Sequence, residues 1–236
     1  MALSLDGRGG LARVGIVVGL VAEARIAGRL GLVETGGGLP AGARKAAERL
    51  VARGATALVS FGLAGGLDPN LQPGHLVIPR AVLEDGVRYR TDRALSDSFG
   101  GTNTALMFAG QEIVANSVAK RDLFLATGAC AVDLESGAVA RVAQRHDLPF
   151  AVLRAICDPA GRDLPPAALV ALDAGGAIGL LRVLASVAGR PGQIAGLIRL
   201  ARDAGLARQA LMAVSRDIPV ETAPRSAPPT HPDPQD

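Results

Sequence analysis

Tryptophan is absent from this sequence of 236 residues, and other aromatic side chains are few, with one Tyr and five Phe. The basic residues are dispersed rather than gathered in a dense run, and the formal net charge is only +3. A protein that binds single-stranded nucleic acid needs aromatic side chains for base stacking and a basic groove for the phosphates. The sequence supplies neither, so we expect no nucleic-acid partner.

Cysteine and histidine are also rare. Cys130 and Cys157 each lie inside an apolar run, as reduced core cysteines do, which indicates the cytoplasm rather than an oxidising compartment. His75, His146 and His231 are far from one another and from both cysteines along the chain, so the spacing of a metal site is missing. We expect no metal and no other cofactor.

An uninterrupted apolar segment of membrane-spanning length is missing as well. The first residues, MALSLDGRGGLAR, lack the apolar stretch of a signal peptide. Residues 168–189 are the one segment that could suggest a membrane span, but Asp173, Arg182 and four glycines interrupt it. One or two buried helices are the interpretation that we favour there.

What the sequence does have is apolar residues in short alternating patterns. Hydrophobic residues form 49% of the chain, which is enough for the core of one domain. Short β-type runs alternate with helical patterns, which predicts one three-layer α/β/α domain around a central twisted mixed sheet. We place this domain at residues 12–218, after a flexible N-terminus at residues 1–11. The proline-rich residues 219–236 are expected to form a disordered tail.

The clearest patterns give bounds for individual elements. Strands are expected at residues 13–21, 56–62 and 150–158, and helices at residues 42–54 and 136–146. Residues 74–86 contain two short β pieces broken at Pro79, and terminal helices extend to about residue 217. Residues 91–109 show no clear period, so we expect a loop near the ligand site there.

Three acidic residues follow predicted strands. Glu23 comes after VGIVVGLVA, Glu135 after ACAVDL, and Asp158 after FAVLRAIC. Ligands of open α/β sheets bind beside the carboxyl ends of the strands, so acids from distant parts of the chain can share one crevice. For each acid alone, a solvated surface position is the alternative. Their common placement, together with the glycine-rich turn of residues 60–69, favours a functional site.

Four segments together resemble the nucleoside phosphorylase/nucleosidase superfamily, above all its methylthioadenosine/S-adenosylhomocysteine nucleosidase-like branch: VGIVVGLVAEA, SFGLAGGLDPNLQPGHLVIP, AVDLESGAVA and VLRAICDPA. The resemblance spans residues 13–200 and implies a nucleoside phosphorylase-like fold. Within the branch, the sequence is most similar to the hopanoid-associated phosphorylases. That similarity implies an adenosylhopane nucleosidase, which releases adenine and leaves ribosylhopane for hopanoid biosynthesis.

The resemblance also implies a role for each acid. Asp158 matches the family's acid that protonates or hydrogen-bonds N7 of the purine, and burial should raise its pKa so that it holds a proton. Glu23 matches the general base that activates water, and Glu135 matches the ligand of the ribose hydroxyls. Asp133 occupies the other acidic position of the triplet Asp-Leu-Glu, where a structural and a catalytic contact are both open.

Further residues are expected to contact the substrate. They are Leu63, Ala64 and Gly65 in the glycine-rich turn, Leu134 in the acidic triplet, and Ile113 and Val114 in the segment of residues 110–118. Leu63 replaces a serine of the methylthioadenosine nucleosidases, which suggests a different water network or an apolar sugar substituent. The segment of residues 110–118 lacks an aromatic, so Ile113 and Val114 are expected to sandwich the base.

The choice between water and phosphate as nucleophile depends on three positions. Phosphate-using members of the family hold the anion with two arginines and a serine, and the corresponding positions here are Glu23, Ser60 and Leu63. A carboxylate repels phosphate and a leucine offers it no hydrogen bond, so the sequence favours water. The arginines left as candidates for an anion site are Arg25, Arg44 and Arg88.

The terminal segment of residues 193–214 carries Ile194, Leu197 and Ile198 on one helical face and arginines elsewhere. Such a helix can lie on an anionic membrane, and packing on the core or on a dimer partner is the alternative. For a nucleoside with a lipidic 5′ substituent, we expect a cytoplasmic enzyme with peripheral contact at the inner membrane. The resemblance implies a homodimer.

Three other functions stay open at this point. The first is a conventional methylthioadenosine/S-adenosylhomocysteine nucleosidase with a small polar substrate. The second is a phosphate-dependent nucleoside phosphorylase, and the third is a non-catalytic nucleoside-binding protein on the same scaffold.

Overall fold

The computed structural model describes residues 13–169, 189 and 191–218. The expected N-terminal and C-terminal tails, and almost all of the apolar segment of residues 168–189, lie outside these described residues. Among the described residues, no helix is both long enough and apolar enough to cross a membrane.

A mixed sheet forms the centre of the described structure. Its strands are β1 (Val14–Val18), β2 (Leu32–Thr35), β3 (Ala57–Gly66), β4 (Leu76–Val77), β5 (Ala81–Glu84), β6 (Val87–Arg90), β7 (Met107–Ala109), β8 (Ala131–Asp133) and β9 (Phe150–Asp158). The longest strand, β3, pairs in parallel with β1 and β9, and its last residues, Gly65 and Gly66, pair with β8 in the antiparallel sense. The carboxyl ends of β1, β3 and β9 therefore lie side by side.

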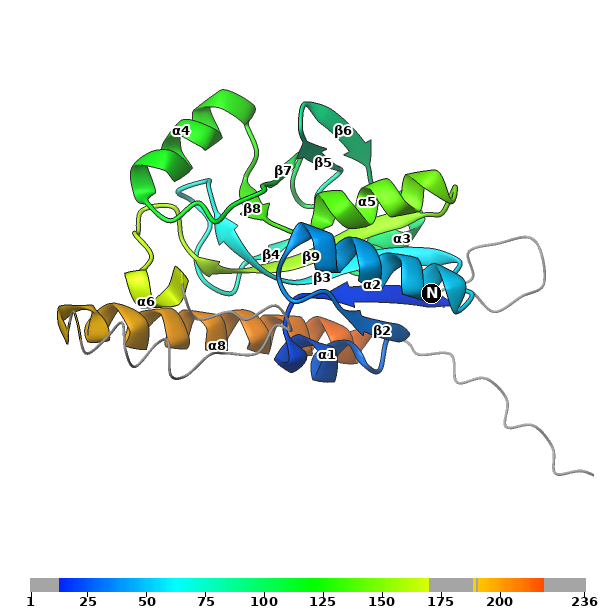
Figure 1. Ribbon diagram of the computed structural model, residues 1–236, viewed down its shortest axis with the longest axis horizontal. Helices are drawn as coiled ribbons and strands as arrows, with labels where there is room; N and C mark the ends of the chain where they lie inside the picture. The colour runs from blue at the N-terminus through cyan, green and yellow to red at the C-terminus, as the bar shows by residue number, and fades with distance from the viewer. Residues whose placement is uncertain (1–12, 170–188, 190, 219–236) are drawn as a thin grey trace, which may run out of the picture.

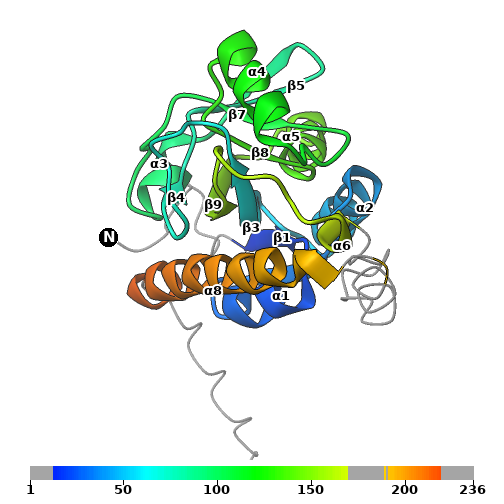
Figure 2. The same ribbon diagram turned by 90° about the vertical axis from the view of Figure 1, so that its left-hand side faces the viewer.

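Helices cover both faces of the sheet. They are α1 (Val21–Ala27), α2 (Pro40–Ala52), α3 (Arg93–Asp97), α4 (Ser117–Thr127), α5 (Ser136–Arg145), α6 (Pro166–Leu169) and α8 (Ile194–Asp217). Helices α2 and α5 lie on one side of β1 and β3, and α1 and α8 lie on the other (Figure 1). The view in Figure 2 separates α4 and α5 from α1 and α8, with the strands between them. This arrangement confirms the three-layer prediction.

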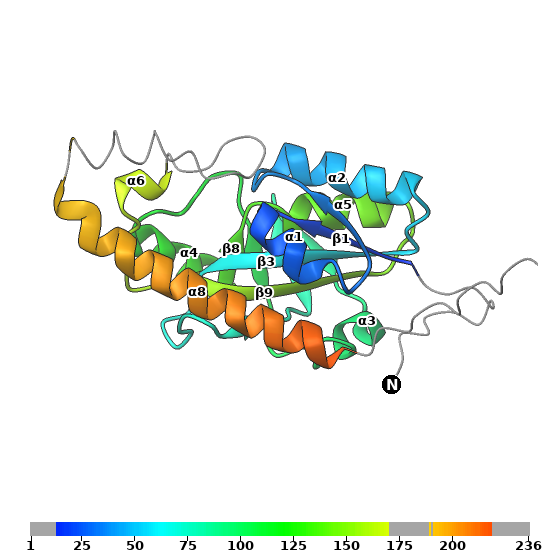
Figure 3. The ribbon, with the colours of Figure 1, turned by 90° about the horizontal axis from the view of Figure 1, so that it is seen from below.

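Alternation along β1 explains why both faces are covered. Val17 packs in one core cluster with Leu50 of α2, whereas Ile16 packs in a second cluster with Leu211 of α8. Successive side chains of a strand point to opposite faces, so a strand that is apolar at every position is buried on both sides. Figure 3 shows α8 running across β3 and β9 on the second face.

Most predicted elements occur within a few residues of their expected bounds, and β9 occurs at residues 150–158 as predicted. The prediction for residues 91–109 was wrong, because this segment contains α3 and β7 and none of its residues lines the cavity described below. The carboxylate of Asp92 caps α3 by accepting from the Leu95 amide, and β7 lies between β5 and β8. Helix α4 was not predicted, although Asn116 caps its start and Gly128 ends it with φ of 70°.

Candidate active site

The three acids at the strand ends meet at one cavity of about 570 Å³. Glu23 lies in the first turn of α1, shortly after β1, Glu135 directly precedes α5, and Asp158 ends β9. Their exposed fractions are only 2%, 3% and 7%. The other predicted contact residues line the same cavity: Leu63, Ala64, Gly65, Ile113, Val114, Asp133 and Leu134. The structure thus brings together all ten of the residues chosen from the sequence.

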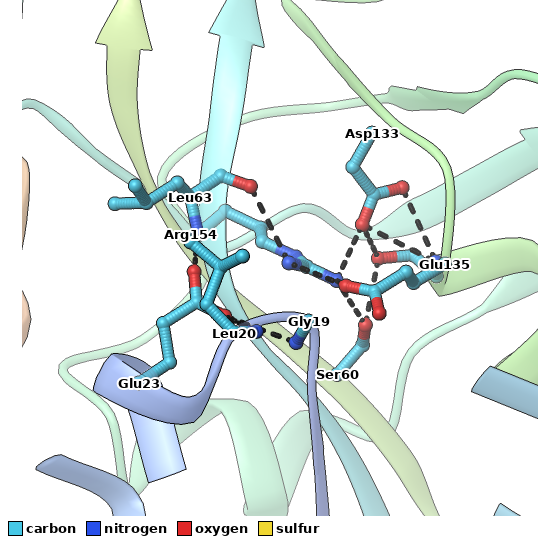
Figure 4. Close-up of polar contacts among 9 residues, drawn as sticks. Gly19, Leu20, Glu23, Ser60, Leu63, Asp133, Glu135 and Arg154 are labelled. Atoms are coloured by element: carbon cyan, nitrogen blue, oxygen red, sulfur yellow. Dashed lines mark hydrogen bonds and ion pairs between the residues drawn. The ribbon is translucent and has the colours of Figure 1, made fainter. Parts of the chain in front are cut away.

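Glu23 is held by backbone amides from the segment after β1 and from β3. Its Oε2 accepts hydrogen bonds from Gly19 at 3.0 Å and Leu20 at 2.7 Å, and its Oε1 accepts from the Leu63 amide at 2.9 Å (Figure 4). Burial raises the pKa of Glu23, and the nearby Arg154 and these amides offset only part of that effect. A carboxylate with a raised pKa is a stronger base, held here in a fixed orientation.

Arg154 of β9 lies at the centre of the acidic cluster and was missed in the sequence analysis. Its Nη2 lies 2.6 Å from Asp133 Oδ2 and 3.2 Å from Glu135 Oε2, and it donates to Ser60 Oγ at 2.6 Å (Figure 4). The side chain is 1% exposed. An arginine inside the apolar strand FAVLRAICD was the available signal, because a buried guanidinium requires acidic partners.

Glu135 keeps one oxygen free. Its Oε2 accepts from Arg154, whereas its Oε1 is buried and accepts no hydrogen bond within the described part of the chain. Burial raises the pKa of Glu135 to about 7; Arg154 opposes this rise, while Glu23 and Asp133 add to it. An unpaired buried acceptor beside a cavity is suited to a hydroxyl donor from a ligand.

Asp133 has its oxygens engaged inside the protein. Both oxygens accept from the Ser136 amide at 3.2 Å, and Oδ2 also accepts from the Ser136 hydroxyl at 2.6 Å. With Arg154 on the same oxygen, these contacts favour the structural alternative for Asp133. Its carboxylate fixes Arg154 and the start of α5.

Asp158 has a buried partner that the sequence analysis also missed. Nζ of Lys120, from α4, donates to Asp158 Oδ2 at 2.6 Å, and the lysine is fully buried. Burial raises the pKa of Asp158, and the hydrogen bond and charge of Lys120 offset only part of that rise. No sequence signal marked Lys120, because a lysine within AKRD is typical of a solvated helix face.

The cavity is lined by apolar side chains as well as by the charged residues described above. The apolar wall consists of Leu164, Ala167, Ala168, Leu197, Leu200, Ala201 and Ala204, of which the last four belong to α8. Arg25, Arg44 and Arg88, the sequence candidates for an anion site, do not line the cavity. Within the described ranges, no group of three or more His, Cys, Asp or Glu residues could hold a metal ion.

The sequence model of the phosphorylase superfamily matches residues 17–102 and 102–175. The chain belongs to the phosphorylase superfamily. A curated relative, the 5′-methylthioadenosine/S-adenosylhomocysteine nucleosidase of Geobacillus kaustophilus (strain HTA426), is 28% identical over 135 residues, which are 45% of this chain and 57% of that protein. The chain thus spans about half the length of the curated relatives that it matches.

Solved structures show the same fold for this superfamily member. The S-adenosylhomocysteine nucleosidase of Streptococcus pyogenes, in complex with 5-methylthiotubericidin, has a TM-score of 0.62 at 17% identity, covering 91% of this chain and 100% of that one. The 5′-methylthioadenosine/S-adenosylhomocysteine nucleosidase of Colwellia psychrerythraea 34H, in complex with adenine, has a TM-score of 0.62 at 16% identity, covering 89% and 96%. The nucleoside phosphorylase-like fold predicted from the sequence is therefore confirmed.

Proposed function

We propose that this protein is a purine nucleosidase that hydrolyses the N-glycosidic bond of a 5′-substituted adenosine. The observation that carries this proposal is the convergence of Glu23, Glu135 and Asp158 on one cavity, each almost fully buried. The names of the curated and structural relatives support the same reaction class.

Each acid has the environment that its step requires. Glu23 takes a proton from the attacking water, and its raised pKa makes it a better base. Oε1 of Glu135 accepts a hydrogen bond from a ribose hydroxyl, and its negative charge stabilises the cationic sugar that develops as the bond breaks. Asp158 delivers a proton to N7 of the purine, which its raised pKa favours, so that the base leaves as a neutral molecule.

The charges of the site favour water over phosphate. Glu23, Glu135 and Asp133 surround Arg154, and two of these carboxylates already contact its guanidinium. A phosphate anion beside Arg154 would face this acidic cluster, whose carboxylates already hold the guanidinium; a second arginine, Arg208 of α8, also lines the cavity. We therefore infer hydrolysis rather than phosphorolysis.

The apolar wall supports a lipidic 5′ substituent. Seven leucine and alanine side chains line the same cavity as the acids, and each Å² of apolar ligand surface that they cover stabilises binding by about 25 cal/mol. Adenosylhopane, which the resemblance implies, fits this chemistry. Ile113 and Val114 line the cavity and are proposed to cover the base.

A conventional methylthioadenosine/S-adenosylhomocysteine nucleosidase is the second candidate, favoured by the similarity to the Geobacillus enzyme. A non-catalytic nucleoside-binding protein is less well supported, because a ligand-binding role alone does not require three nearly buried acids with raised pKa values.

Product analysis by mass spectrometry tests the proposal. The protein is incubated with adenosylhopane or methylthioadenosine, each with and without phosphate. We expect adenine and the free 5′-substituted ribose from both, no dependence on phosphate, and a higher kcat/KM for adenosylhopane. A ribose 1-phosphate product would contradict hydrolysis, and a preference for methylthioadenosine would favour the second candidate.

One variant and its control test the link between the reaction and Asp158. Asp158→Asn should still bind adenine but lose adenine release by about 10²- to 10⁴-fold, which is the usual contribution of a positioned acid. Asp122→Asn, an exposed acid of α4, is the matched control and should behave as the wild type. Wild-type turnover by Asp158→Asn would contradict the assignment.

A further inference from the structure

The chain contains two lysines with opposite environments. Lys45 is exposed on α2, whereas Lys120 of α4 is fully buried. Nζ of Lys120 donates to Asp158 Oδ2 at 2.6 Å, to the Arg162 carbonyl at 2.8 Å and to the Pro159 carbonyl at 3.2 Å. An ammonium group has three N–H donors, so each of them has an acceptor.

The two carbonyl contacts fix the ammonium independently of the carboxylate. Pro159 and Arg162 belong to the turn that follows β9, so they hold Nζ beside Asp158 whichever protonation state the acid has. A buried ammonium is costly to desolvate unless its partners replace its hydration. This site replaces that hydration completely and places the charge against the proposed proton donor.

We propose that Lys120 is a positioning residue for the departure of the base: it binds Oδ2 of Asp158, leaves the other carboxyl oxygen to carry the proton, and neutralises the carboxylate that remains after transfer. The inference rests on the proposed nucleosidase function. It assigns a role to a residue of α4, which contributes no other residue to the reaction described above.

The proposed step conserves protons and electron pairs. The C1′–N9 bond breaks and its electron pair moves into the purine, while the O–H bond of Asp158 breaks and an N7–H bond forms. The oxygen of water bonds to C1′, and Glu23 takes the proton that this water loses. After release of adenine, Glu23 is protonated and Asp158 is a carboxylate paired with Lys120; exchange of one proton through water restores the resting state.

Other charged groups near Asp158 offset each other. Arg162, in the turn after β9, and Asp203, on α8, act on Asp158 with opposite signs and form an ion pair at 2.5 Å. Arg208 of α8 and Glu23 of α1 act on the neighbouring Cys157, again with opposite signs. Lys120 is therefore the unbalanced charge in direct contact with the donor, and its removal should change the proton affinity of Asp158.

The test compares Lys120→Met with Lys45→Met, the same substitution at the exposed lysine. Two substrates are used across a range of pH: a 5′-substituted adenosine and 4-nitrophenyl riboside, whose leaving group departs without protonation. Without Lys120, adenine release should fall about tenfold to a hundredfold, and the loss of kcat/KM at high pH should move up by about one pH unit. Hydrolysis of the nitrophenyl riboside should fall much less.

The outcomes separate this inference from the proposed function. If the wild type releases no adenine from any adenosine derivative, the proposed function fails. If the wild type releases adenine and Lys120→Met shows an unmoved pH profile and an unchanged ratio of the two rates, only the role of Lys120 is overturned. Lys45→Met should match the wild type in both assays.

A measurement on protein that retains Lys120 covers the case in which Lys120→Met does not fold. With two lysines, the ¹⁵Nζ spectrum contains two signals, and Lys45→Met leaves only that of Lys120. Its chemical shift should change with pH at the same midpoint as the loss of kcat/KM at high pH, because the ammonium contacts the titrating carboxyl. A shift that stays constant across that range would overturn the proposal.

Discussion

Glu135 shows how a functional residue can oppose folding. Its carboxyl is 3% exposed, it shares Arg154 with Asp133, and one of its oxygens has no hydrogen bond within the described residues. Burial, together with the charges of Glu23 and Asp133, raises its pKa from 4.5 to about 7. The ionised form, which the proposed contact with a ribose hydroxyl requires, is therefore the form that the folded protein disfavours.

This conflict predicts a pH dependence of stability. Between about pH 4.5 and pH 7 the folded state keeps a proton on Glu135 that the unfolded state has released, so raising the pH favours unfolding. The free energy of unfolding should therefore fall with rising pH across this window, by about 3 kcal/mol for Glu135 alone. Urea unfolding at a series of pH values measures it.

Glu135→Gln should reduce that slope and leave the protein more stable than the wild type at pH 8, with much lower activity. Part of the slope should persist, because burial also raises the pKa values of Glu23 and Asp158. Glu112→Gln is the control, because it makes the same substitution at an exposed glutamate that lines the cavity. Its slope should match that of the wild type, since no buried carboxyl is removed. If the free energy of unfolding of Glu135→Gln falls with pH as steeply as that of the wild type, the carboxyl of Glu135 has the same pKa in the folded and unfolded states.

At the scale of elements, the close approach of α1 and β9 across β3 depends on Gly62. This residue has φ of 148°, and a Cβ there would lie 2.6 Å from Glu23 Oε1 and 2.8 Å from Arg154 Nη1. A methyl group at this point must displace the carboxylate of Glu23, the proposed general base, or the guanidinium of Arg154.

Gly62→Ala should therefore abolish most activity and lower the free energy of unfolding by more than the strain of a positive φ, which is about 1–3 kcal/mol. Gly86→Ala is the matched control, because Gly86 has φ of 79° but no atom within 4 Å of an added Cβ. It should lose stability and keep activity. Thermal unfolding and kcat are measured for both variants. If Gly62→Ala and Gly86→Ala have equal effects on activity, crowding at Gly62 is unimportant.

Helix α8 supplies four of the seven residues of the apolar wall, which predicts an effect on specificity. Leu200→Ser should lower kcat/KM for adenosylhopane by about tenfold to a hundredfold, because it removes apolar contacts of about 1.5–3 kcal/mol. Methylthioadenosine should be affected much less. Leu206→Ser, on the exposed side of the same helix, is the control, and an equal loss for both substrates would contradict a lipid-binding wall.

The sequence predicted those elements whose pattern is local. Strand β9 is apolar except for Arg154 and Asp158, and the acids that follow β1 and end β9 meet because both strands pair with β3 in parallel and their carboxyl ends share an edge. Glu135 reaches the same cavity by another route, since β8 pairs with the end of β3 in the antiparallel sense. Arg154 and Lys120 could not be assigned in this way, since their partners come from other elements. The short elements α3 and β7 were missed because five and three residues are too few to show a period.

At the scale of the whole molecule, α8 faces in two directions. Its inner side lines the cavity with Leu197, Leu200 and Ala204, while Ile194 and Ile198 are exposed on its outer side. The sequence prediction that Leu197 shares one face with Ile194 and Ile198 was therefore wrong. If the substrate carries a lipid as proposed, that lipid must pass from a membrane into the cavity, and α8 lines the cavity on one side. We propose that its outer side meets an anionic membrane, and that the protein is a homodimer as the resemblance implies.

The arginines of α8 make the membrane proposal testable. Arg199 and Arg202 are exposed beside Ile198, so binding to phosphatidylglycerol vesicles should exceed binding to neutral vesicles and weaken with salt. The double substitution Arg199→Glu and Arg202→Glu should abolish flotation with these vesicles while methylthioadenosine hydrolysis is kept. The matched reversal of Arg44 and Lys45, on the opposite layer, should leave flotation intact.

The same variants distinguish a membrane face from a dimer contact. If the outer side of α8 joins two copies of the chain, charge reversal at Arg199 and Arg202 removes every contact that these arginines make with acceptors of the other copy and sets carboxylates against those acceptors, so sedimentation should show a monomer. If the face binds membrane, sedimentation should show the wild-type mass and only flotation should be lost. A dimer that the substitutions dissociate, with no wild-type flotation at low salt, would contradict the membrane proposal and assign α8 to the subunit interface.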